Sequence, residues 1–122
     1  MAKILVIDDN IATVSMLETL LKVSGHEVVF AYDGPTGIQK ALAENPRLIL
    51  LDIMMPQMDG IEVCAALRKE PATASTPIVI LSAKADEQAV KRALAAGANE
   101  YQFKPFDIEK LVKVVEKYTD NK

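Results

Sequence analysis

The stretch RLILLDIMMPQMDG, residues 47–60, places a single acidic residue, Asp52, directly after an apolar run. The run Leu48–Leu51 is too short for a buried helix and has no polar alternation, which is typical of a strand covered on both faces. Strands of this kind form parallel sheets between two layers of helices, and such sheets bind ligands beyond the carboxyl ends of their strands. Asp52 therefore lies where a ligand site is expected.

The composition is that of an ordinary globular domain. The chain has 122 residues, of which 50% are hydrophobic and 25% are charged. This length can bury a core without disulfides or structural metals, so we expect one domain over residues 1–122. The formal net charge of −3 leaves no basic stripe for a nucleic-acid backbone. We therefore expect no direct binding to nucleic acid.

The single cysteine and the first residues of the chain indicate in which cellular compartment the protein is expected. The single cysteine, Cys64, has no partner for an intramolecular disulfide and is interpreted as a small buried helix residue. The apolar run Ile4–Ile7 stops at two aspartates, which makes it too short for a signal peptide or a membrane span. We therefore expect a cytoplasmic protein that does not bind membranes.

Hydrophobic periodicity predicts alternating strands and helices along the whole chain. Strands are predicted at residues 4–7, 26–32, 48–51, 78–81 and 101–103, and helices begin near residues 11, 36, 61, 86 and 108. Glycine or proline marks most of the boundaries, including a turn at 33–35. Five strands that alternate with five helices through short loops predict a doubly wound α/β fold, with a five-stranded parallel sheet in a three-layer α/β/α arrangement.

Polar residues follow four of the five predicted strands. They are Asp8 and Asp9, Asp52, Ser82 and Lys104. A parallel sheet brings the carboxyl ends of its strands to one edge, so these side chains can converge. Taken singly, the aspartates and Lys104 have plainer interpretations, because an aspartate often caps a helix and a lysine before proline is usually solvated.

Three carboxylates at one edge favour a bound cation. Asp8, Asp9 and Asp52 would raise one another's pKa unless a positive charge screened them. Mg²⁺ prefers oxygen ligands and is commonly paired with phosphate oxygens. A carboxylate can act as a nucleophile toward a phosphoryl group, while a lysine and a hydroxyl contact its oxygens. The set therefore favours phosphoryl transfer to an aspartate, with Lys104 and Ser82 as the phosphoryl contacts.

Four ordered motifs resemble those of the receiver domains of bacterial two-component response regulators, including the chemotaxis-type single-domain regulators. The motifs are ILVIDDN (4–10), LLDIMMPQMDG (50–60), PIVILSA (77–83) and GANEYQFKPF (97–106). The resemblance covers essentially the whole chain. It implies a CheY-like sheet with strand order 2-1-3-4-5.

The resemblance also implies roles for individual residues. Asp52 would accept the phosphoryl group, and Ser82 and Lys104 would contact it. The ligands of Mg²⁺, or of its substitute Mn²⁺, would be Asp8, Asp9, Asp52 and the backbone carbonyl of Met54. Ser82 and Tyr101 would form the switch. The threonine common in the family is replaced here by Ser82, which keeps the hydroxyl.

Two positions that tune dephosphorylation in the family correspond to Met54 and Lys84. An apolar Met54 cannot orient an attacking water by hydrogen bonding, and Lys84 is not a base in its charged form. We therefore predict slow self-dephosphorylation.

The resemblance implies a phosphorylation-activated signalling switch rather than a conventional enzyme, one that catalyses only its own phosphorylation and slow dephosphorylation. The donor would be a sensor histidine kinase or a histidine phosphotransfer protein. The surface formed by the fourth helix, fifth strand and fifth helix would act on a downstream protein partner or a fused output domain. A monomer and a phosphorylation-dependent dimer are both compatible with the sequence, as are a stand-alone regulator and a fragment of a longer protein.

Three other function classes fit the residues less well. A haloacid-dehalogenase-like phosphatase would have a second aspartate two residues past the nucleophile, where this chain has Met54. A flavin or dinucleotide binder would be expected to carry a Gly-x-Gly-x-x-Gly motif, which does not occur. A pseudo-receiver, acting only as an interaction module, normally lacks one of the acidic residues, and all are present here.

Overall fold

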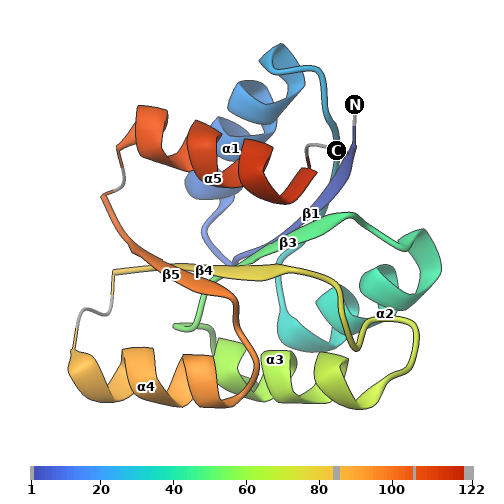
Figure 1. Cartoon of the computed structure of the whole chain (residues 1–122), viewed down its shortest axis with the longest axis vertical. Helices are drawn as coiled ribbons and strands as arrows, with labels where there is room; N and C mark the ends of the chain where they lie inside the picture. The colour runs from blue at the N-terminus through green and yellow to red at the C-terminus, as the bar shows by residue number, and fades with distance from the viewer. Residues whose placement is uncertain (1, 84–85, 106, 120–122) are drawn as a thin grey trace.

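The computed structural model describes residues 2–83, 86–105 and 107–119 (Figure 1). Strands and helices alternate along the described residues. In chain order they are β1 (Lys3–Ile7), α1 (Ile11–Val23), β2 (Glu27–Ala31), α2 (Gly34–Glu44), β3 (Leu48–Leu51), α3 (Gly60–Lys69), β4 (Ile78–Ser82), α4 (Glu87–Ala95), β5 (Glu100–Phe103) and α5 (Ile108–Thr119).

The strands form one parallel sheet in the order β2-β1-β3-β4-β5, which confirms the predicted fold class and strand order. Helices α1 and α5 cover one face, and α2, α3 and α4 cover the other (Figure 1). The central strand β3 is paired on both sides, with Leu51 opposite Ile7 on β1 and Ile80 on β4. The end of β3 therefore lies at the middle of the carboxyl edge.

The core has two halves, one on each face of the sheet. Alternate residues of β1, β3 and β4 point to opposite faces, so Ile49 packs toward α3 whereas Leu50 packs toward α1 and α5. All four residues of β3 are buried. The absence of polar alternation in 48–51 therefore results from burial on both faces, as predicted.

Local side chains begin the helices. Asn10, Asp33, Asp59 and Asp86 are the N-caps of α1 to α4, and each accepts a hydrogen bond from a backbone N–H one turn into its helix. At the start of α3, Asp59 and Glu62 also form the capping box that their spacing predicts. These caps fix where the chain turns back from the carboxyl edge.

Two local predictions were wrong. The segment 33–35 forms no separate turn, because Gly34 and Pro35 already belong to the first turn of α2. Proline is tolerated there, since a backbone N–H in the first turn of a helix has no partner within the helix. His26 lies outside the strand that begins at Glu27. Its Nδ1 accepts a hydrogen bond from the backbone N–H of Ala2, so the imidazole joins the ends of β1 and β2.

Among the described helices, none combines the length and the apolar character needed to cross a membrane.

Candidate functional site

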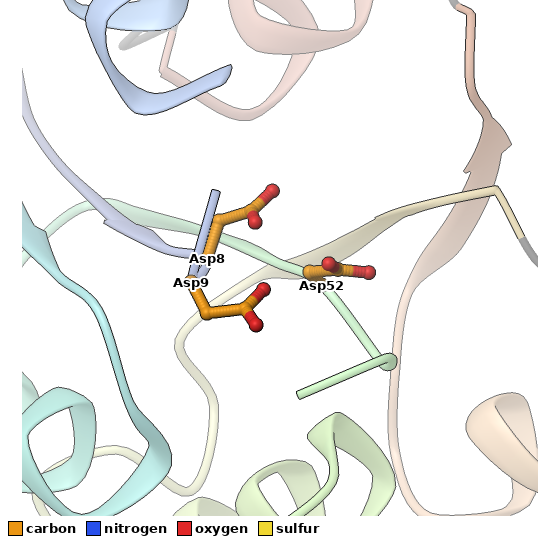
Figure 2. A group of neighbouring side chains, drawn as sticks. All are labelled: Asp8, Asp9 and Asp52. Atoms are coloured by element: carbon orange, nitrogen blue, oxygen red, sulfur yellow. The ribbon is translucent and has the colours of Figure 1, made fainter. Parts of the chain in front are cut away.

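The carboxylates of Asp8, Asp9 and Asp52 lie together at the carboxyl edge of the sheet (Figure 2). One oxygen of each falls within 4.8 Å of the others. Asp8 and Asp9 directly follow β1 and Asp52 directly follows β3. The two strand ends are held together by a hydrogen bond from the Asp52 N–H to the Ile7 carbonyl, 2.9 Å long. Strand pairing therefore forms the cluster.

Burial differs among the three carboxylates. The side chains of Asp8 and Asp52 are 3% and 8% exposed, whereas Asp9 is open to solvent. Burial and the nearby charge of Asp8 raise the pKa of Asp52 above the ordinary value for aspartate. The Lys104 ammonium, the Met54 N–H and the Ser82 hydroxyl act in the opposite direction and lower that pKa.

Lys104 crosses the edge from the loop after β5 to the acidic cluster. Its Nζ lies 2.7 Å from Oδ2 of Asp8 and 3.6 Å from Oδ2 of Asp52, and its side chain is only 18% exposed. Its backbone N–H donates to the Ser82 carbonyl, and its peptide bond to Pro105 is cis. The plainer interpretation of Lys104 as a solvated lysine is therefore wrong.

Ser82 and Tyr101 extend the site from Asp52 into β4 and β5. Ser82 is fully buried at the end of β4, and its side chain hydrogen-bonds with both Asp52 and Tyr101. Tyr101 is half-buried, and burial raises the pKa of its hydroxyl, which the contact with Ser82 partly offsets. Its ring packs against Phe103, with 5.3 Å between the ring centroids. A continuous polar path therefore runs from Asp52 to the edge strand.

Of the two residues predicted to tune dephosphorylation, the structure describes only Met54. Met54 is 55% exposed, while its backbone N–H donates to Oδ1 of Asp52 over 3.1 Å. The neighbouring Met55 is buried in the core. Lys84 lies outside the described residues.

Sequence reasoning missed two backbone contacts that shape the site. The Asn10 N–H donates to Oδ1 of Asp8, 2.9 Å away. Gly60, at the start of α3, donates its N–H to the Ile53 carbonyl. A Cβ at residue 60 would collide with the carbonyl oxygen of Asp52 and lie 2.7 Å from the Cα of Ile53. The only signal in the sequence was the glycine itself, which marks the boundary before the helix predicted near residue 61.

The donor set fits a hard divalent cation. All three clustered side chains offer oxygen, the donor that Mg²⁺ prefers. Among the residues that the structure describes, Lys104 alone forms ion pairs with this cluster, so two of its three negative charges stay uncompensated there, and a divalent ion would balance them. The exposed carboxylate of Asp9 leaves an open side where water and a further ligand can complete the coordination.

Comparison with known proteins identifies the family. The model for the response regulator receiver domain matches residues 4–116. The chain belongs to this family. It is therefore a receiver domain of a two-component response regulator, as its motifs indicate, and the expectation that it is not a conventional enzyme fits this family.

Two of the relatives that match are longer than this chain. The receiver domain is 39% identical over 112 residues to the response regulator ArlR of Staphylococcus saprophyticus, covering 92% of this chain and 50% of ArlR. It is 44% identical over 104 residues to the alkaline phosphatase synthesis transcriptional regulatory protein PhoP of Bacillus subtilis, covering 85% of this chain and 42% of PhoP. The chain thus spans about half the length of these relatives.

Solved structures share the fold over nearly their full length. The chemotaxis protein CheY4 of Vibrio cholerae superposes with a TM-score of 0.91 at 33% identity, covering 97% of this chain and 98% of that one. The receiver domain of a sensor histidine kinase from Pseudomonas aeruginosa PAO1 superposes with a TM-score of 0.90 at 27% identity, and 98% of each chain is covered. That structure contains a magnesium ion coordinated in its active site cleft.

Proposed function

We propose that this receiver domain is switched by phosphorylation of Asp52, with a phosphohistidine of a sensor histidine kinase or a histidine phosphotransfer protein as the donor. One observation carries the proposal. Asp52 is buried at the centre of the carboxyl edge, between two further carboxylates and the side chains of Lys104 and Ser82. A simple helix cap or surface aspartate would need none of these neighbours.

The proposed reaction uses groups that are already in place. A carboxylate oxygen of Asp52 attacks phosphorus, the P–N bond to the donor imidazole breaks, and its electron pair stays on that nitrogen. The Met54 N–H fixes the orientation of the attacking carboxylate through Oδ1. The Lys104 ammonium, already 3.6 Å from Oδ2, and the Ser82 hydroxyl donate to the transferred oxygens. The chain thus catalyses its own phosphorylation.

Mg²⁺, or Mn²⁺ as a substitute, would be held by Asp8, Asp9, Asp52 and the backbone carbonyl of Met54. When bound, it supplies positive charge beside the phosphoryl oxygens. The carboxylates of Asp8 and Asp9 serve to retain the cation, and Lys104 neutralises the charge that the cation leaves uncompensated.

The proposed output passes through Ser82 and Tyr101. In the unphosphorylated chain the Ser82 side chain contacts both Asp52 and Tyr101. A phosphoryl group on Asp52 draws the hydroxyl of Ser82 toward it, which frees space for the Tyr101 ring to turn inward. The surface of α4, β5 and α5 changes as a result and regulates a downstream protein partner or a fused output domain. The receiver domain acts as a monomer or as a phosphorylation-dependent dimer.

The direct test is phosphotransfer to the purified receiver domain. A panel of autophosphorylated sensor kinases, and phosphoramidate as a small donor with a P–N bond, would be incubated with the protein in Mg²⁺ and in excess chelator. Label is expected on the protein only with Mg²⁺ present, because the transferred oxygens need the added positive charge. Equal labelling in chelator, or no labelling by any donor, would contradict the proposal.

The phosphorylated protein is expected to lose its phosphoryl group slowly, with a half-life of minutes or longer. The exposed thioether of Met54 offers no strong hydrogen bond to an attacking water. Met54→Asn is expected to shorten the half-life by about tenfold, because an amide can orient that water. Met54→Leu, which stays apolar, serves as the control and should leave it unchanged. A label chase measures both, and a wild-type half-life of seconds would count against the prediction.

Stability without metal is expected to fall as the pH rises through the raised pKa of Asp52. The folded protein binds that proton more tightly than the unfolded chain, so the stabilisation is complete below the ordinary aspartate pKa and is lost above the folded-state pKa. Mg²⁺ at ten times its Kd should restore about 1.4 kcal/mol at neutral pH. Urea denaturation across this pH range measures both effects. Asp52→Asn should lack this component of the pH dependence, and the same pH slope in both proteins would refute the assignment.

A further inference from the structure

A cavity lies beside the loop that follows Asp52, between that loop and residues of α3 and α4. Its volume is about 370 Å³, within the range of sites that hold small molecules. The lining residues come from the loop after β3, the start of α3 and one face of α4: Ile53, Met54, Met55, Asp59, Ile61, Ala89 and Arg92. None of the three clustered carboxylates lines it.

Five of the seven residues that line this cavity, called here the α3–α4 cavity, have apolar side chains, and the other two are Asp59 and Arg92. Ile53, Met55 and Ala89 are buried, and Ile61 is half-buried above them. They surround the cavity with aliphatic and thioether surface, which favours an apolar body in the occupant. The cavity is therefore suited to a ligand with a hydrophobic part rather than to a free inorganic ion.

The two charged residues that line the cavity differ in their hydrogen-bond partners. The Asp59 carboxylate is committed to capping α3, since it accepts from the Glu62 N–H at 2.9 Å near the positive end of the helix. Arg92 projects from α4, and its guanidinium makes no hydrogen bond or ion pair with any residue that the structure describes. The cavity thus holds one cation, Arg92, that has no partner among the described residues, while the Asp59 carboxylate is held at the start of α3 by its cap hydrogen bond.

We propose that the α3–α4 cavity binds a small organic carboxylate with an apolar body. The carboxylate would pair with the planar guanidinium of Arg92 through two parallel N–H···O bonds. The apolar part would pack against Ile53, Met55 and Ile61. This binding goes beyond phosphorylation of Asp52 and does not require it.

The test is a titration of the unphosphorylated chain with 3-phenylpropionate, followed by NMR chemical shifts. Saturable binding is expected, with shifts centred on Ile61 and Ala89. Arg92→Gln should weaken it by about tenfold or more, the loss expected for a charge-assisted pair. Lys91→Gln removes the adjacent exposed cation of α4 and should leave binding unchanged. The neutral analogue 3-phenylpropan-1-ol should bind more weakly than the carboxylate.

A variant that fills the cavity tests whether binding needs the cavity itself and not only the charge of Arg92. Ile61→Phe keeps Arg92 and reduces the free volume, so it should also weaken binding. The proposal is overturned by the absence of saturable binding in the wild type, by equal losses in Arg92→Gln and Lys91→Gln, or by unchanged binding in Ile61→Phe. Circular dichroism of each variant would confirm that its fold is intact.

Discussion

Asp52→Asn is expected to reduce phosphoryl labelling of the receiver domain to below about 1% of the wild-type level, because an amide oxygen is too weak a nucleophile to form the acyl phosphate. The substitution has almost the same shape, and its side-chain oxygen can still accept the hydrogen bond from the Met54 N–H. The fold should therefore survive while the chemistry is lost. Labelling with phosphoramidate and with kinase donors measures the effect.

Asp9→Asn is the matched control for the loss at Asp52. Asp9 belongs to the same acidic cluster but is exposed and is not the proposed acceptor. Its substitution should shift the Mg²⁺ dependence of labelling to higher concentration and leave labelling attainable at saturation. Labelling of Asp52→Asn at the wild-type level would place the acceptor elsewhere and remove the central part of the proposal.

Gly60→Ala is expected to destabilise the fold by about 3 kcal/mol or more, since the added methyl group has no room. Its Cβ would collide with the Asp52 carbonyl oxygen and press on Ile53. These are backbone atoms at the end of the buried central strand, so they cannot move aside as a side chain would. The midpoint of urea denaturation measures the loss. Any folded fraction should also show weaker phosphotransfer, because the Asp52 backbone is displaced.

Gly25→Ala provides the contrasting control. Gly25 has a φ of +92°, but apart from its chain neighbours no described residue has an atom within 4 Å of the position that a Cβ would take, so its substitution should cost only about 1 kcal/mol from backbone strain. Gly60 has the opposite properties, since its φ is not in the left-handed region and backbone atoms of Asp52 and Ile53 occupy the space that a Cβ would need. If the two variants lost equal stability, close packing at Gly60 would not explain its presence.

The position of the acidic residues was predictable because all strands of a parallel sheet end at the same edge. Once residues 4–7 and 48–51 are recognised as strands buried on both faces, Asp8 and Asp52 must follow neighbouring carboxyl ends if the strands pair. The predicted pairing is observed, with Ile7 opposite Leu51. The capping box of Asp59 and Glu62 was predictable for a similar reason, since it depends on a spacing of three residues within one segment.

Contacts between distant segments were not predictable from patterns. The ion pair between Lys104 and Asp8 joins residues 96 positions apart, and no periodicity encodes it. Likewise, the steric need for glycine at residue 60 depends on how closely the start of α3 approaches the end of β3. The α3–α4 cavity is a further case, because Ile61 of α3 and Arg92 of α4 line it from separate helices.

The alternation of strands and helices, the parallel sheet and the acidic residues at strand ends follow from short-range periodicity and capping, so the residue pattern is enough to predict them. Packing brings the groups of the site into contact. It sets Lys104 between two carboxylates, Ser82 between Asp52 and Tyr101, and Gly60 against the Asp52 backbone. The physical reason is that burial, charge proximity and steric exclusion depend on distances through space, which packing sets after the local elements have formed.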